Sequence, residues 1–192
     1  MLTGVSLSPE LSELAQQFLN VKSDSAELVI GLKETQFNWR PNPDSWSMAE
    51  CLLHLNIAGD RYAHLLEKII DDARSRGLTA AGPFSHGRFS RWILANTEPS
   101  AKRKTKAPRA FTPAYGQPLT AVMPTFLHLQ DQFALLIEKA NGLDLARIKV
   151  PAPGLPIKVN LYVTFAWLAA HERRHLWQAR QVRNHPGFPA AG

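Results

Sequence analysis

Apolar residues that recur every three or four positions are the feature that most constrains the fold of this chain. The first such stripe follows Ser8, a candidate N-cap with Pro9 at the first helical position. It consists of Leu11, Leu14, Phe18, Val21, Ser25, Leu28 and Leu32. Three further segments have the same spacing, and no segment has a convincing strand pattern. The sequence therefore predicts an all-α protein, a bundle of four long helices.

The second helix is expected to begin at a capping box, in which Ser47 is followed three residues later by Glu50. It should end near Gly77, the first strong stop signal. Its apolar positions are Met48, Cys51, Leu52, Leu55, Ala58, Tyr62, Leu65, Leu66 and Ile69. On a helical wheel His54 lies at the margin of this stripe, beside Cys51 and Ala58, so it is neither plainly outside the buried stripe nor at its centre.

The third and fourth helices are expected over residues 124–140 and 160–184. The third should start around Pro124 and end at Gly142, and it presents Phe126, Leu129, Phe133, Leu136, Ile137 and Ala140. The inward stripe of the fourth is Leu161, Thr164, Leu168, His171, His175, Gln178 and Val182. Two histidines thus occupy core positions, which is costly for polar side chains that lack a partner.

Residues 78–118 separate the second and third helices and form a long basic crossover loop within one domain, 1–192. A connection of this length can run along the bundle, so that the two helices it joins point the same way. Between Arg74 and Arg109 nine basic residues face a single acid, Glu98, while the whole chain carries +6. Phe89 to Leu94 can form a short helix. The basic character therefore belongs to the crossover and not to the body of the domain.

Composition narrows the class of protein further. The chain has 192 residues, of which 45% are hydrophobic and 20% charged, as is typical of one globular core. Its single cysteine, Cys51, excludes an intrachain disulfide and a thiolate zinc cluster. The N-terminus does not resemble a signal peptide, and no apolar run has membrane-spanning length. We expect a cytoplasmic protein without a membrane partner.

The stretch from His171 to His175 matches the pattern His-Glu-x-x-His. Histidines four apart on a helix project from one face, where both imidazoles can bind one metal ion. In zinc proteases the glutamate of this pattern is the general base. Here Glu172 lies about 100° around the helix from His171, Gln178 stands where a third ligand could follow, and no edge strand is evident. An HExxH-type metalloprotease is therefore the least favoured hypothesis.

The alternative to a protease is a metal site shared with His54. Three neutral imidazoles around one ion leave positions open for water or substrate, as in catalytic sites. Gln178, one turn beyond His175, can serve as a hydrogen-bond partner of a ligand. The residues alone leave open whether these histidines are instead isolated, as we expect for the remaining four, His64, His86, His128 and His185.

Several short motifs, in order and spacing, resemble the DinB-like (YfiT-type) superfamily over nearly the whole chain. The motifs are the lead-in Trp39, Pro41, Pro43, Trp46 and Ser47, the segment 46–55, the segment 171–178 and the ending 180–183. The resemblance implies a four-helix bundle of up-down-down-up topology. It also implies a divalent transition metal on His54, His171 and His175, with zinc or nickel expected and iron or manganese as alternatives.

Members of that superfamily include thiol-dependent S-transferases, a thiol-dependent isomerase and hydrolases. The resemblance therefore implies a metal-dependent enzyme that activates water or a low-molecular-weight thiol toward a small-molecule substrate. The alternative is a non-catalytic interaction or nucleic-acid-binding bundle that uses the basic segment 102–109. Nucleic acid is disfavoured, because aromatic residues are not interleaved with that segment as stacking requires. A homodimer formed through a helix face is a further expectation.

Overall fold

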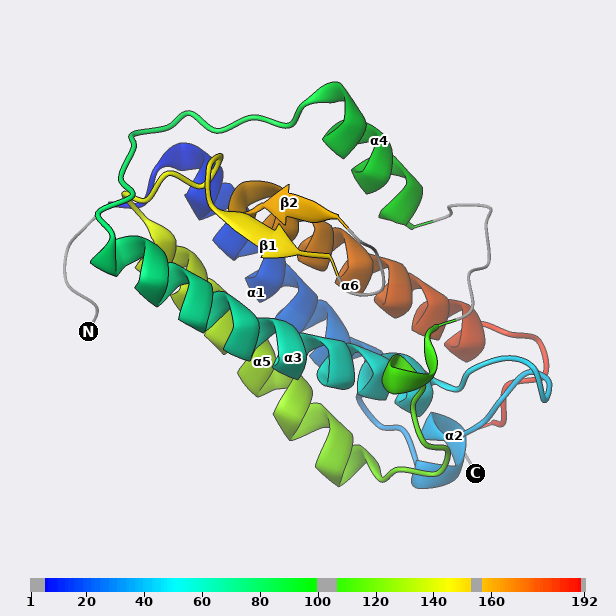
Figure 1. Cartoon of the computed structure of the whole chain (residues 1–192). Coiled ribbons are helices and arrows are strands. Elements are labelled where there is room, and N and C mark those ends of the chain that lie inside the picture. Colours follow the sequence, from blue (N-terminus) through cyan, green and yellow to red (C-terminus); the bar gives the residue numbers. More distant parts are fainter. Residues whose placement is uncertain (1–5, 100–106, 153–156, 191–192) are drawn as a thin grey trace.

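Four long helices carry the core of the computed structural model, which describes residues 6–99, 107–152 and 157–190. They are α1 (Pro9–Val29), α3 (Met48–Ser75), α5 (Leu119–Ala140) and α6 (Leu161–Arg183). In Figure 1 α1 and α6 run one way and α3 and α5 the other. α3 packs against both α5 and α6, and α1 packs against the same two helices. The chain is a four-helix bundle, as its apolar stripes predict.

Local sequence explains where two of these helices, α3 and α6, begin. Ser47 Oγ accepts a hydrogen bond from Glu50 N–H at 3.2 Å, and Glu50 Oε2 accepts one from Ser47 N–H at 3.0 Å. The predicted capping box of α3 is therefore confirmed. Asn160 caps α6 by accepting from Val163 N–H at 2.8 Å. Past the end of α3, Gly77 adopts a φ of 64°, the left-handed conformation that terminates many helices.

The core is made by the predicted stripes. All the buried residues of α1 belong to the first stripe, namely Leu11, Leu14, Phe18, Val21, Ser25 and Leu28. Phe18 stacks on Phe133 of α5 with ring centroids 4.9 Å apart, and both rings are fully buried. Burial of this apolar surface is the main stabilising term of such a bundle. Among the described residues no helix is both long and apolar enough to span a membrane.

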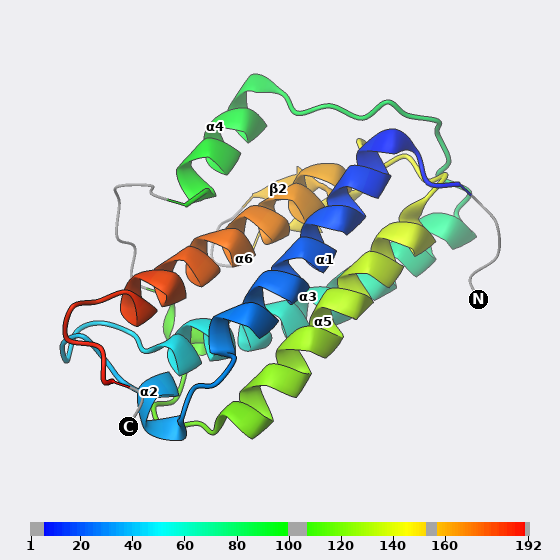
Figure 2. The ribbon, with the colours of Figure 1, turned by 180° about the vertical axis from the view of Figure 1, so that it is seen from behind.

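The segment between α3 and α5 contains more structure than a loop. α4 (Arg88–Thr97) lies along α6, as Figures 1 and 2 both show, and it includes the short helix expected at Phe89 to Leu94. A 3₁₀ turn, η1 (Arg109–Phe111), lies against α3. Residues 102–106, which are most of the basic segment 102–109, lie outside the described residues. A further short helix, α2 (Glu34–Phe37), precedes the proline-containing loop before α3.

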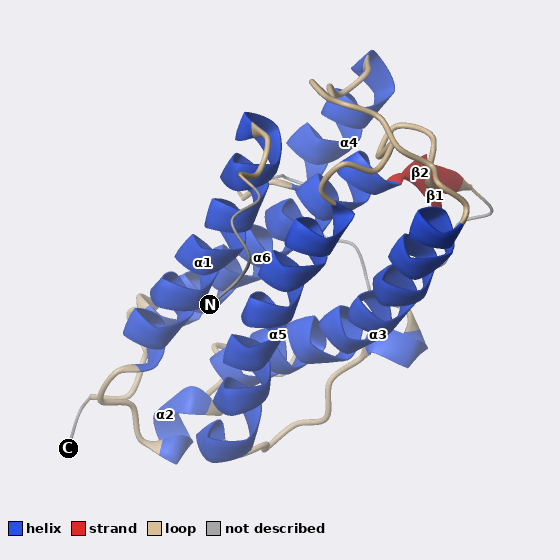
Figure 3. Ribbon diagram, turned by 90° about the vertical axis from the view of Figure 1, so that its left-hand side faces the viewer, coloured by secondary structure: helices blue, strands red, loops and turns tan. Residues whose placement is uncertain are grey.

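Two expectations about secondary structure were wrong. α5 begins at Leu119 and not at Pro124, which lies exposed inside the helix. Glu34 of α2 accepts a hydrogen bond from Leu119 N–H at 3.0 Å, so a distant carboxylate caps the added turn. The chain also forms an antiparallel hairpin of β1 (Lys149–Pro151) and β2 (Lys158–Asn160). Figure 3 shows that strands within the described residues are confined to this hairpin.

Candidate metal centre

Three histidines from two helices meet on the side of the bundle where α3 faces α6. One ring nitrogen from each of His54, His171 and His175 lies within 4.8 Å of the others. His54 Nε2 is 3.4 Å from His171 Nε2, and the ring centroids of His54 and His175 are 4.6 Å apart. The structure thus brings together residues 117 positions apart in the sequence. This group of nitrogens is able to bind one metal ion.

The outer nitrogens of two of the imidazoles are occupied by oxygen acceptors. His54 Nδ1 lies 2.7 Å from the carbonyl oxygen of Phe111 in η1. His175 Nδ1 lies 3.1 Å from Gln178 Oε1. Because a carbonyl oxygen can only accept, each Nδ1 carries the proton and each Nε2 keeps its lone pair. Metal-bound histidines in proteins are held by the same kind of contact, so the donor set fits a transition metal.

Burial keeps these imidazoles neutral. Desolvation lowers the pKa of His54, and it lowers the pKa of His171 to about 3, with the neighbouring His54 adding to the effect. The pKa of His175 is also held well below its usual range, by desolvation first and then by His171 and His54. A proton would compete with a metal for the same lone pair. At neutral pH all three side chains are therefore ready to act as ligands.

Indole rings enclose the cluster on two sides. Trp46, which precedes α3, lies 5.0 Å from the ring of His54 and 5.8 Å from that of His175, measured between centroids. Trp167 stacks on His171 at 4.9 Å with an interplanar angle of 12°. His54 is 6% exposed, whereas His171 and His175 keep part of their surface in contact with solvent. The site is therefore flanked by two indole rings and remains partly accessible to solvent.

The predicted stripe of α6 is confirmed at Leu161, Thr164, Leu168 and Val182, which are all buried. His171 and His175 face α3, as its spacing predicts, yet they are not fully buried core residues. The adjacent face of α6 is the more deeply buried one, and it includes Ala169, Glu172, Leu176 and Ala179. A polar face that lines an opening between helices has the same periodicity as a core stripe, which is why the two were not distinguished.

Glu172 does not belong to the histidine cluster. Its side chain is 3% exposed, and its Oε1 accepts a hydrogen bond from Gln130 Nε2 in α5 at 3.3 Å. The pKa of Glu172 is raised to about 8, because the effect of burial exceeds the opposing effect of the Gln130 hydrogen bond. A carboxyl group held on the α5 side of α6 cannot act as general base at the three histidines. The geometry therefore does not support the metalloprotease hypothesis.

The other four histidines do not join the centre. His64 and His128 are exposed on α3 and α5, and His185 packs on Trp39 with centroids 5.4 Å apart. His86 stacks on Tyr162 at 4.7 Å. These positions agree with the expectation that all four are isolated. They also provide surface histidines that can serve as controls.

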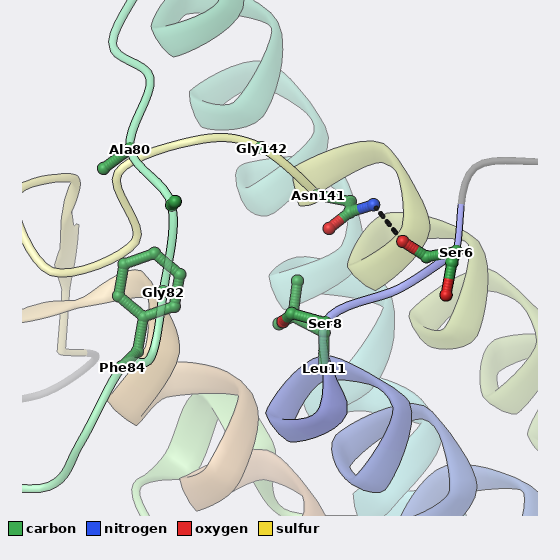
Figure 4. A pocket seen from close by; sticks show the side chains of 9 residues that line it. Ser6, Ser8, Leu11, Ala80, Gly82, Phe84, Asn141 and Gly142 are labelled. Atoms are coloured by element: carbon green, nitrogen blue, oxygen red, sulfur yellow. Dashed lines mark hydrogen bonds between the residues drawn. The ribbon is translucent and has the colours of Figure 1, made fainter.

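A cavity of about 270 Å³ lies at the other end of the bundle, where α3 ends and α1 begins. Figure 4 shows Ser8, Phe84 and Gly142 around it, and Asn141 donating a hydrogen bond to the carbonyl of Ser6. Its described lining contains no histidine and no acidic residue. The cavity therefore has no groups suited to metal binding or acid–base chemistry.

Comparison with known proteins agrees with this geometry. The family model of the DinB superfamily matches residues 17–179, a span that contains all three histidines. The chain belongs to the DinB superfamily. No curated protein is significantly similar to it in sequence. Membership in the DinB superfamily matches the resemblance drawn from the motifs around His54 and His171.

A solved structure provides the fold comparison for this DinB-superfamily chain. YfiT from Bacillus subtilis, described as a probable metal-dependent hydrolase with an unusual four-helix bundle topology, is similar with a TM-score of 0.62. The two share 12% sequence identity, and the similarity covers 98% of this chain and 95% of YfiT. At that level of identity the likeness shows a common fold and not a common substrate.

Two contributors to the centre were not predicted from the sequence. Trp167 stands four residues before His171, a spacing that places the two rings on one face of α6, so it could have been found. Phe111 contributes only its backbone carbonyl, from a 3₁₀ turn that lies 57 residues beyond His54 in the chain. A backbone acceptor leaves no compositional signal, and this contact was therefore not predictable.

Proposed function

We propose that this protein is a metal-dependent enzyme whose divalent ion is held by His54, His171 and His175. One observation carries the proposal: three ring nitrogens converge within 4.8 Å at a partly open site. A closed structural site would surround its ion with four protein ligands, whereas three leave room for a reactant. Zinc or nickel suits three imidazoles best, with iron or manganese as alternatives.

The residues of this chain have distinct tasks in such an enzyme. Phe111 O and Gln178 Oε1 hold the protons of His54 and His175 at Nδ1 and orient the rings. Trp46 and Trp167 exclude water from two sides of the cluster. A bound divalent ion supplies Lewis acidity, which lowers the pKa of water or of a thiol toward neutrality.

We place hydrolysis of a small-molecule substrate first. The description of YfiT as a probable metal-dependent hydrolase supports this choice, since its bundle is similar over almost the whole chain. Thiol-dependent S-transfer is the second candidate, because a thiolate can occupy the open position in place of water. Two assays distinguish these candidates. A hydrolase should release acid from esters or amides, whereas an S-transferase should consume free thiol in the presence of an electrophile.

Metal content tests the proposal directly. The untagged protein should hold about one equivalent of a divalent metal by inductively coupled plasma mass spectrometry, after reconstitution and removal of excess ion. His171→Ala should hold almost none, because two imidazoles remain. His128→Ala, which removes an exposed histidine from α5, is the matched control and should bind as the wild type does. Equal metal content in all three proteins would refute the assignment.

A further inference from the structure

An apolar cavity of about 110 Å³ is lined in part by Trp167, the residue that stacks on His171. α6 contributes Val163, Thr164 and Trp167, α3 contributes Tyr62, and α4 contributes Ile93, while the β1–β2 hairpin supplies the remaining wall. Four elements, α3, α4, the hairpin and α6, therefore meet around one small space. α4 lies alongside α6 in Figure 1 and covers this part of the bundle.

The cavity and the histidines are lined by the same helix faces. Tyr62 stands two turns beyond His54 on α3, and Trp167 stands one turn before His171 on α6. With a rise of 1.5 Å per residue, these steps correspond to about 12 Å and about 6 Å along the helices. The indole of Trp167 lines the cavity and also stacks on His171 at 4.9 Å. Trp167 thus borders both the cavity and the histidine cluster.

The chemistry of the lining favours an apolar occupant. No charged side chain contributes to the described wall, and the hydroxyl of Thr164 already donates to Asn160 O at 3.0 Å. The ring of Tyr62 lies 5.6 Å from that of Trp167, measured between centroids, and both aromatic residues line the cavity. The volume is somewhat below the roughly 150 Å³ of an apolar cavity that binds benzene. A short alkyl chain or a small ring therefore fits.

We propose that this cavity binds a short apolar substituent of the substrate while the reacting group faces His54, His171 and His175. The inference rests on the proposed function and narrows it to small amphipathic substrates, those with a polar reactive end and an apolar tail. Ile93 makes α4 part of the specificity pocket. Glu98, just beyond α4, accepts a hydrogen bond from Arg173 Nε of α6 at 3.1 Å, which holds the end of α4 in place.

Binding of two hydroxamates tests this inference without any turnover. Acetohydroxamate and hexanohydroxamate share a metal-chelating head and differ by four methylenes. Dissociation constants are measured by calorimetry on the zinc-loaded protein and by ligand-observed NMR on protein stripped with EDTA. Each methylene that enters an apolar cavity tightens binding about fourfold. If two methylenes enter, hexanohydroxamate should bind roughly fifteenfold more tightly than acetohydroxamate.

Two variants fill the cavity from independent sides. Ile93→Trp does so from α4 and Ile157→Trp from the hairpin, and both side chains are partly exposed, so the folded bundle should accept a larger ring. In each variant the two hydroxamates should bind within about twofold of one another while metal content is unchanged. Trp92→Ile is the matched control, since Trp92 is 62% exposed on α4 and lies outside the cavity. It should keep the full preference.

The outcomes separate the inference from the proposed function. Equal affinities of the two hydroxamates in the wild type would overturn the inference, and so would an undiminished preference in both filled variants. If the wild type took up no metal, the proposed function would fail, yet the ratio of the two affinities could still be read by NMR. A ratio near one in that experiment would overturn the inference as well.

Discussion

Replacement of Arg40 by methionine should destabilise the protein by stranding a buried carboxylate. Glu50 is 2% exposed and accepts hydrogen bonds from Ser47 N–H, from Arg40 Nε at 2.7 Å and from Arg40 Nη2. The Arg40 side chain is 32% exposed and lies over the ring of Tyr115. Removing one partner of a buried ion pair costs about 3–5 kcal/mol. Because water can reach the space that the guanidinium leaves, we expect about 3 kcal/mol.

Replacement of Glu50, the other partner of this ion pair, should lower the free energy of unfolding by less. In Glu50→Gln the amide oxygen can still accept from Ser47 N–H, and the guanidinium of Arg40 can turn toward solvent. The loss is then that of charge-assisted hydrogen bonds, about 1–2 kcal/mol. The double variant Arg40→Met/Glu50→Gln contains no buried unpaired charge. Its loss in the free energy of unfolding should therefore be about 2 kcal/mol smaller than the sum of the two single losses.

Urea denaturation followed by far-ultraviolet circular dichroism measures these differences in the free energy of unfolding. For a domain of this size, a loss of 3 kcal/mol corresponds to a fall in Tm of about 6–12 °C. His54 lies one turn beyond Glu50 on α3, so metal occupancy is a second measure of how far the substitution disturbs this part of the helix. Additive single costs, or a loss below about 1 kcal/mol in Arg40→Met, would refute the reasoning.

Two further changes test contacts around the centre and the fold. Gln178→Leu removes the acceptor of His175 Nδ1–H and should weaken zinc affinity by about 10–100-fold in a chelator competition. Gln181→Leu, an exposed change on the same helix, should leave that affinity unaltered. Glu34→Ala removes the carboxylate that caps Leu119 N–H and should lower the free energy of unfolding by about 1 kcal/mol. An unchanged urea midpoint would show that α5 does not need this cap.

The parts of the fold that depend on residues close together in the chain were predicted from the sequence. The buried residues of α1 all lie on its predicted stripe, and Ser47 and Glu50 form the predicted capping box. Both features act within a few residues of the chain, where spacing and side-chain type determine the structure. The start of α5 was missed, because the turn before Pro124 is capped by Glu34, which is 85 residues away.

The sequence by itself determined that four apolar stripes must pack as helices and that His171 and His175 share one helical face. It also suggested, through motif resemblance, which third histidine belongs with them. Only the tertiary structure decided how close His54 comes, that Phe111 O holds its proton, and that the cluster opens to solvent. Periodicity is a property of one helix, whereas distances and exposure arise from the packing of several.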